Sequence, residues 1–183
     1  MKFVPQVIPD IVLIEPTLHG DDRGYFSETF RQDLFNEAIG RDINFIQDNE
    51  SKSTKGVLRG LHYQVPPFSQ SKLIRVSYGR IIDIVVDLRK SSPSFGKYIA
   101  EELSDTNNRQ IFIPHGFAHG FIVLSDTAIV SYKVDNYYSR EHERGIIYND
   151  ENLNIEWNFD LKNIIVSDKD KAHPALTEAF KFE

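Results

Sequence analysis

Between residue 45 and about residue 135, hydrophobic and polar residues alternate along the chain with a period of two. Short runs rich in isoleucine, valine and aromatic residues are separated by turn signals such as Tyr78-Gly79 and Ser92-Pro93. This period predicts strands, because successive side chains of a strand point to opposite faces. Many short strands with frequent turns indicate an antiparallel sandwich or closed barrel, not a parallel α/β sheet.

The two ends of the chain predict only peripheral helices. Residues 1–30 indicate strands broken by turns, with HGDDRG (19–24) as a loop. RQDLFNEAI (31–39) carries a helical stripe that Gly40 ends, and we expect this short helix to pack outside a sheet. PALTEAFKF (174–182) predicts a terminal helix. We find neither a linker nor an internal repeat, so we expect a single domain over residues 1–183.

In a strand, residues at every second position have the same parity and share a face. This parity places two polar residues on faces that are otherwise apolar. In KLIRVSY, Lys72 has the parity of Ile74, and in AIVSYKV, Tyr132 has the parity of Val130. The structural alternatives are a lysine that reaches water from a strand end and a core tyrosine whose hydroxyl lies at the rim. The functional alternative is that both side chains face a pocket inside the barrel.

The stretch FIQDNESKSTKGVLRGLHYQ (45–64) combines a polar strand face with two residues suited to chemistry, Arg59 and His62. It indicates either a solvated sheet face or a pocket floor, with arginine for an anion and histidine for proton transfer. In a regular strand these two residues have opposite parity. Both can face one pocket only if a bulge lies near Gly60, where a glycine permits one.

Composition limits the classes of function. The net charge of −6, from 21 Lys and Arg against 27 Asp and Glu, argues against a nucleic-acid binder but leaves room for a local basic pocket. Because there is no cysteine, disulfides, thiolate metal sites and cysteine nucleophiles are excluded. No stretch reaches the ~20 apolar residues of a membrane span, and no secretory signal is visible. We therefore expect a cytoplasmic protein without membrane contact.

Metal and cofactor motifs are also missing. IPHGFAHGF (113–121) has two histidines four residues apart, but Pro114, Gly116 and Gly120 disfavour the helix that would bring them to one face. No His-x-His occurs, so a three-histidine site would need distant partners. Glycine-rich phosphate loops of Walker or Rossmann spacing are absent, which disfavours nucleotide hydrolysis and hydride transfer. We expect neither a metal nor a cofactor.

Five segments occur in the order and approximate spacing of one known family, and together they cover most of the chain. They are DDRGYFSETF (21–30), the stretch 45–64, QSKLIRVSYGRIIDIVVDLRKSSPSFGKY (70–98), IPHGFAHGFIVLSDTAIVSYKVDNYY (113–138) and VSDKD (166–170). The chain resembles the dTDP-4-dehydrorhamnose 3,5-epimerase family of cupin-type jelly rolls. PHGFAH also resembles the second cupin motif, while the first is missing. The resemblance implies an all-β, antiparallel jelly-roll barrel with a few short peripheral helices and no metal.

The resemblance also implies a reaction and roles for four residues. The family removes protons from carbons 3 and 5 of a dTDP-linked 4-keto-6-deoxy sugar, each α to the ketone, and returns protons on the opposite face. Such chemistry needs a base, an acid and stabilisation of the enolate oxygen. By resemblance His62 is the base, Asp170 its carboxylate partner, Tyr132 the acid, and Lys72 a cation near the C4 oxygen.

Further positions match the family's binding residues and imply a homodimer. By resemblance the ligands for the diphosphate and sugar are Arg23, Arg59 and His119. Partners for nucleotide or sugar are Glu28, Gln47, Asn49, Glu143 and Lys169, and Tyr138 matches the residue that stacks on thymine. In the family, the segment around Phe26 and Glu28 comes from the neighbouring subunit.

Several alternatives stay open at this point. YNDE (148–151) stands where family members often have Trp-Asn-Asp-Pro, so the substrate could be another nucleotide sugar or a heptose, or one carbon alone could react. A sugar-binding jelly roll without catalysis is a different class, disfavoured by the coexistence of base, partner and acid. A metal-dependent cupin oxygenase or isomerase is disfavoured by its missing ligands, and a metal assay would test it.

Overall fold

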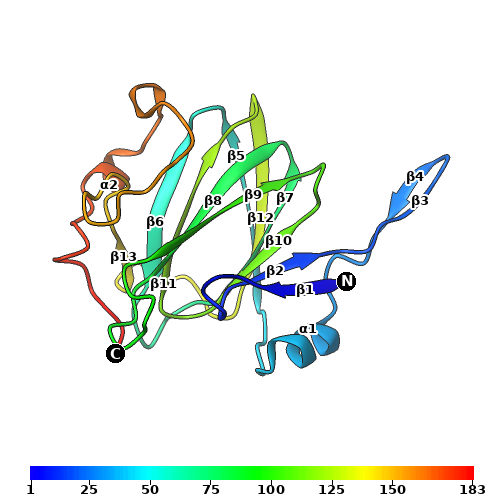
Figure 1. Cartoon of the computed structure of the whole chain (residues 1–183), viewed down its shortest axis with the longest axis horizontal. Coiled ribbons are helices and arrows are strands. Elements are labelled where there is room, and N and C mark those ends of the chain that lie inside the picture. The colour runs from blue at the N-terminus through cyan, green and yellow to red at the C-terminus, as the bar shows by residue number, and fades with distance from the viewer.

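The computed structural model describes residues 1–183, and its strands form two facing antiparallel sheets with one small separate hairpin (Figure 1). The six-stranded sheet has the order β1 (Lys2–Pro5), β2 (Val12–Glu15), β10 (Gln110–Ile113), β7 (Lys72–Tyr78), β12 (Thr127–Val134) and β5 (Gln47–Thr54). The five-stranded sheet has the order β13 (Glu143–Gly145), β6 (Leu58–Gln64), β11 (Phe117–Val123), β8 (Arg80–Asp87) and β9 (Tyr98–Ser104). The predicted all-β jelly-roll barrel is therefore confirmed.

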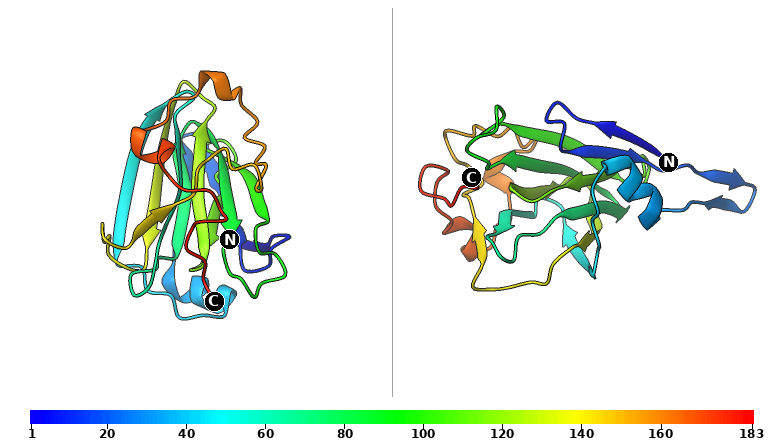
Figure 2. Two further views of the ribbon diagram at one scale, coloured as in Figure 1. Left: turned by 90° about the vertical axis from the view of Figure 1, so that its left-hand side faces the viewer. Right: turned by 90° about the horizontal axis from the view of Figure 1, so that it is seen from below.

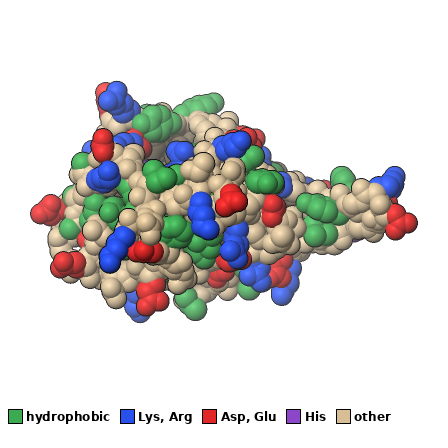
Figure 3. Space-filling model, turned by 90° about the horizontal axis from the view of Figure 1, so that it is seen from above, with side chains coloured by type: hydrophobic (Ala, Val, Ile, Leu, Met, Phe, Trp, Pro, Cys, Tyr) green, Lys and Arg blue, Asp and Glu red, His purple; other side chains and the backbone are tan.

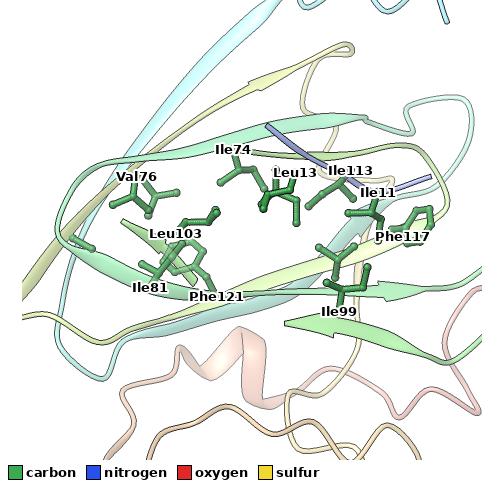
Figure 4. Close-up of a cluster of buried hydrophobic side chains, with 14 of the residues drawn as sticks. Ile11, Leu13, Ile74, Val76, Ile81, Ile99, Leu103, Ile113, Phe117 and Phe121 are labelled. Atoms are coloured by element: carbon green, nitrogen blue, oxygen red, sulfur yellow. The ribbon is translucent and has the colours of Figure 1, made fainter. Parts of the chain in front are cut away.

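A hydrophobic cluster packs between the two sheets (Figure 4). Ile74 and Ile113 come from the six-stranded sheet, while Ile81, Leu103 and Phe121 come from the five-stranded sheet, and all are buried. Each such side chain contributes roughly 1.5–3 kcal/mol on burial. Alternate residues of each strand supply the cluster, so the neighbouring residues of the same strands must point outward.

The outer face of the five-stranded sheet is also buried, because the C-terminal part of the chain covers it. Ile84 and Val86 of β8 pack there with Trp157 and Leu176 in a second hydrophobic cluster. This covering segment contains the short helices η1 (Leu161–Asn163) and α2 (Asp168–Lys171), and α2 lies beside β6 (Figure 1). A strand buried on both faces explains why RIIDIVVDLR is rich in apolar residues at both parities.

One predicted helix is confirmed and another is wrong. Helix α1 (Gln32–Ile39) ends at Gly40, which has φ +68°, and its Phe35 packs outside the six-stranded sheet against Phe112. Residues 174–182 form only a turn, since Leu176 is drawn into the second cluster and the amide of Phe182 donates to the carbonyl of Leu88. None of the helices combines the length and the apolar character that crossing a membrane requires.

An arm of residues 19–26 projects from the barrel. The segment 19–24, predicted as a loop, forms most of a hairpin of β3 (His19–Asp21) and β4 (Gly24–Phe26). Figures 1 and 2 show this hairpin standing away from both sheets, and Figure 3 shows hydrophobic side chains along it. Tyr25 is 59% exposed and Phe26 71% exposed. Exposed aromatic residues on a projecting hairpin are typical of a contact surface.

Candidate active site

A cavity of about 540 Å³ opens between the two sheets. Its wall from the six-stranded sheet includes Lys72 and Tyr132, and its wall from the five-stranded sheet includes His62 and His119. Asp170 of α2 completes the lining. A smaller side pocket of about 180 Å³ shares His62, Lys72 and Tyr132 with this main cavity. Chemistry-bearing residues from distant segments thus meet at one place inside the barrel.

Arg59 and His62, which lie before and after Gly60, face the same cavity because the pairing of β6 with β11 is irregular at Gly60. Against β11, His62 pairs with His119 while Arg59 pairs with Phe121, so three steps along β6 match two along β11. Gly60 has φ +131°, and a Cβ on it would lie 2.5 Å from the Cα of Gly120. Only glycine fits this conformation and this close approach. The bulge predicted near Gly60 is confirmed, and both Arg59 and His62 line the main cavity.

His62 is held by a carboxylate from the far end of the chain. Its Nε2 lies 2.8 Å from Oδ1 of Asp170, while Oδ2 accepts a hydrogen bond from the Gly60 amide at 3.1 Å. Ser167 caps α2 and orients this carboxylate by accepting from the Asp170 amide. Burial raises the pKa of Asp170, but the bonds from His62 and Gly60 outweigh it and lower the pKa to about 2. An ionised Asp170 fixes the proton of His62 on Nε2 and leaves Nδ1 as the free acceptor.

Lys72 and Tyr132 lie on the inner face of the opposite sheet, among apolar neighbours. Tyr132 is paired with Ile74 across β7, and both residues have the inward parity expected from the sequence. Burial lowers the pKa of Lys72 to about 8, although Asp83 and Glu143 oppose this shift. Burial also raises the pKa of Tyr132, so its phenol keeps its proton near neutral pH. The cavity therefore has a phenol on the wall that faces His62.

His119 is buried beside a carboxylate that sequence reasoning did not select. Its Nε2 lies 2.7 Å from Oδ2 of Asp83, which is completely buried on β8. Burial lowers the pKa of His119, with Asp83 acting in the opposite direction. The sequence feature that could have indicated Asp83 is an aspartate between isoleucines in RIIDIVVDLR. A charged residue inside an apolar strand usually has a partner.

The side pocket gathers most of the other predicted binding residues. Gln47 and Asn49 of β5 line it, and the amide of Gln47 donates to Oδ1 of Asn49 at 2.8 Å. Glu143 accepts a hydrogen bond from the hydroxyl of Tyr138 at 2.8 Å and pairs with Lys169 at 2.6 Å. Although burial raises the pKa of Glu143, these two bonds lower it overall.

Three predicted binding residues do not reach the cavity of their own chain. Arg23 lies at the turn of the arm, where its guanidinium pairs with Asp21, and Phe26 lies on β4. Glu28 follows the arm, and neither the main cavity nor the side pocket includes any of the three. Their side chains are available for contact outside this chain.

One further histidine, absent from the sequence-based selection, lies beside the His62–Asp170 pair. The ring of His173 meets that of His62 edge to face, with centroids 5.5 Å apart. Its Nε2 lies 3.7 Å from Oδ1 of Asp170, and the three groups are close enough to hold a metal ion. Burial is the largest cause of the lowered pKa of His173. The sequence feature that could have indicated His173 is its spacing from Asp170, because the two residues are three apart at a helix end.

Comparisons with known proteins agree with this fold. The family model described as dTDP-4-dehydrorhamnose 3,5-epimerase matches residues 5–178. The dTDP-4-dehydrorhamnose 3,5-epimerase of Shigella flexneri is 54% identical over 93% of each chain. The crystal structure of the Elizabethkingia anophelis enzyme of the same name has a TM-score of 0.94 and 46% identity, and each chain is covered to 97%. A Legionella pneumophila epimerase in complex with dTDP-4-keto-L-rhamnose has a TM-score of 0.93 at 43% identity, covering 97% of this chain and 93% of that one.

The fold and these matches together define a cupin-like jelly-roll enzyme of the isomerase class. Within that class, the chain belongs to the dTDP-4-dehydrorhamnose 3,5-epimerase family. The family match covers the arm, α2 and every strand after β1, and therefore every segment that supplies a candidate site residue.

Proposed function

We propose that this chain epimerises C3 and C5 of dTDP-4-dehydro-6-deoxy-D-glucose and yields dTDP-4-dehydro-L-rhamnose, a step in dTDP-rhamnose biosynthesis. The observation that carries the proposal is the position of His62 and Tyr132 on opposite walls of one cavity. Inversion at a carbon requires that the proton leave from one face and return to the other. A base and an acid on facing sheets satisfy this requirement for a sugar ring bound between them.

The proposed reaction begins with proton transfer to Nδ1 of His62. The electrons of the broken C–H bond move into the ketone, and the enolate carries its negative charge on the C4 oxygen. Protonated Lys72 stabilises this oxygen. Tyr132 then donates its hydroxyl proton to the opposite face of the carbon, and the ketone reforms. The imidazolium returns its proton to solvent, the phenolate regains one, and the same cycle follows at the second carbon.

The nucleotide diphosphate is proposed to bind beside this centre. Arg59 and Lys169 give the main cavity a local positive charge on a chain whose net charge is −6, and arginine suits a phosphate group. Tyr138 is 56% exposed at the side pocket, where its ring is free to stack on thymine. His119, Gln47, Asn49 and Glu143 supply hydrogen-bonding groups to sugar or base.

A homodimer is the proposed assembly, with the arm of one subunit completing the site of the other. Arg23, Phe26 and Glu28 match the family's binding residues, yet they lie away from the cavity of their own chain. A projecting hairpin with exposed aromatic residues supports insertion into a neighbour. A cytoplasmic location, expected from the sequence, stays a prediction that cell fractionation would test.

Proton NMR in deuterated water, without added metal, tests the proposed function. With dTDP-4-dehydro-6-deoxy-D-glucose as substrate, we expect solvent deuterium at both C3 and C5. Label at one carbon alone would reduce the activity to mono-epimerisation, a related reaction that the same base and acid can perform. If neither carbon exchanges, catalysis on this sugar is rejected and a sugar-binding role gains support.

A further inference from the structure

His173 has no part in the proposed proton transfers, yet its ring is buried against the reacting pair. Its Nε2 is inaccessible to solvent and lacks a hydrogen-bond partner. Oδ1 of Asp170 lies 3.7 Å from this nitrogen, too far for a hydrogen bond. A buried imidazole nitrogen without a partner costs free energy, so its position calls for a ligand or a compensating contact.

The backbone around His173 is shaped to hold the imidazole in this place. Gly145 pairs with His62 across β13 and β6, and a Cβ on it would lie 2.3 Å from Nε2 of His173. The same Cβ would be within 2.5 Å of the two ring carbons beside that nitrogen, so the ring occupies the space of a side chain. Strands β6 and β13 and helix α2 thus bring two imidazoles to one carboxylate.

We propose that His62, Asp170 and His173 form a zinc-binding site. One nitrogen of each histidine and one oxygen of Asp170 all lie within 4.8 Å of one another. Oδ1 of Asp170 is 2.8 Å from Nε2 of His62 and 3.7 Å from Nε2 of His173. Tetrahedral zinc with bonds of about 2.1 Å separates its ligands by roughly 3.4 Å, so small movements suffice. Two imidazoles with one carboxylate favour zinc over magnesium or calcium, which prefer oxygen ligands.

Zinc at this position would switch the enzyme off. His62 lines the main cavity, so an ion can enter from there and keep its fourth position open towards it. Zinc on Nε2 takes the place of the single ring proton that now bonds to Asp170, and this proton moves through solvent to Nδ1. The neutral zinc-bound ring then carries its one proton on Nδ1, which can no longer accept a proton from the sugar. This inhibition rests on the proposed role of His62 as base, whereas the binding of zinc does not.

The test measures zinc binding and epimerisation separately. Chelator-treated protein is titrated with zinc against a chromophoric chelator, and cobalt absorption reports the ligand geometry. His173→Phe keeps a ring against Gly145 but removes the donor, and we expect zinc affinity to fall at least about tenfold. Its metal-free epimerisation should stay close to that of the parent. Zinc should inhibit the parent at concentrations that leave His173→Phe active.

A matched control comes from another histidine–aspartate pair. His115 lies 3.0 Å from Asp135 but belongs to no group of three metal ligands, so His115→Phe should bind zinc like the parent. His173→Asn serves as a second variant if the phenylalanine disturbs folding, which near-ultraviolet circular dichroism would reveal. Equal zinc affinity in parent and both His173 variants, or no binding to the parent, would overturn the site. Zinc binding that depends on His173 without inhibition would keep the site and reject His62 as the base.

Discussion

At the scale of one residue, burial changes the pKa of Lys72, the residue proposed to stabilise the enolate oxygen. Burial lowers its pKa to about 8, so Lys72 is mostly protonated at neutral pH and loses its charge as the pH rises through that value. The cation is the form that stabilises an enolate oxygen. We therefore expect kcat/KM to fall above about pH 8.

The matched variant is Lys72→Arg, whose guanidinium stays charged throughout this range. Where the variant is active, its kcat/KM should lack the fall above about pH 8, and Lys72→Met should be impaired at every pH. A parent profile that stays flat up to pH 10, the range in which free lysine is still protonated, would remove Lys72 from the enolate site.

Single residues differ in how far the sequence could predict them. Parity alone placed Lys72 and Tyr132 inside the barrel, because each occupies an inward position of a regular strand. Asp170 lies 108 residues from His62, and no local pattern joins the two, so only the family resemblance predicted the pair. Asp83 was missed because Ile82 and Ile84 beside it look like the residues of β8 that face the core. These isoleucines do face a hydrophobic core, but it is the second cluster, which β8 forms with the C-terminal segment.

At the scale of elements, the bulge in β6 decides whether Arg59 and His62 can act together. Gly60→Ala would place a Cβ 2.5 Å from the Cα of Gly120 at φ +131°, where the backbone cannot give way cheaply. We expect a loss of roughly 3 kcal/mol or more in the free energy of unfolding, together with loss of epimerisation. Urea denaturation measures the first and the NMR assay the second.

Gly40 provides the control for this prediction. It also has positive φ, at +68°, but a Cβ there meets no atom within 4 Å. Gly40→Ala should cost only about 1 kcal/mol, the usual penalty for a left-handed alanine, and leave activity intact. Equal destabilisation by the two substitutions would mean that the close approach of β6 and β11 does not constrain the site.

Elements were predictable where local chemistry decides them. The apolar stripe and Gly40 predicted helix α1. The structure keeps both features, because the apolar face of the helix is the face that packs against the sheet. Residues 174–182 have helical composition, but Leu176 packs into the second hydrophobic cluster and the amide of Phe182 donates to the carbonyl of Leu88, so the segment forms a turn and no helix. Long-range packing overrode local propensity there, and no pattern within nine residues records it.

At the scale of the whole molecule, the proposed arm exchange predicts recovery of activity in a mixed dimer. Arg23→Ala should impair substrate binding and His62→Ala should abolish proton removal. In a heterodimer of the two variants, isolated by two affinity tags, one site has both the intact base and the partner's intact arm. Such a dimer should have about half of the parental activity, since one of two sites is complete.

The outcome separates arm exchange from an arm that folds back on its own chain. With an arm acting on its own subunit, neither site of the heterodimer is complete, and activity would not exceed the average of the two variants. The arm itself was predicted only as a loop, because all six residues 19–24 are polar or glycine. Its projection away from both sheets is not recorded in the local sequence pattern. The prediction of a single domain over residues 1–183 likewise stays a prediction.

The most direct test of the central claim follows deuterium and configuration together in two variants. Tyr132→Phe keeps His62, so protons should still exchange at C3 and C5, but the label should return mainly on the original face without epimerisation. His62→Ala should lose exchange at both carbons, by a factor on the order of 100 to 10,000. Inversion in Tyr132→Phe at the parental rate, or undiminished exchange in His62→Ala, would contradict a base and an acid on opposite walls of the barrel.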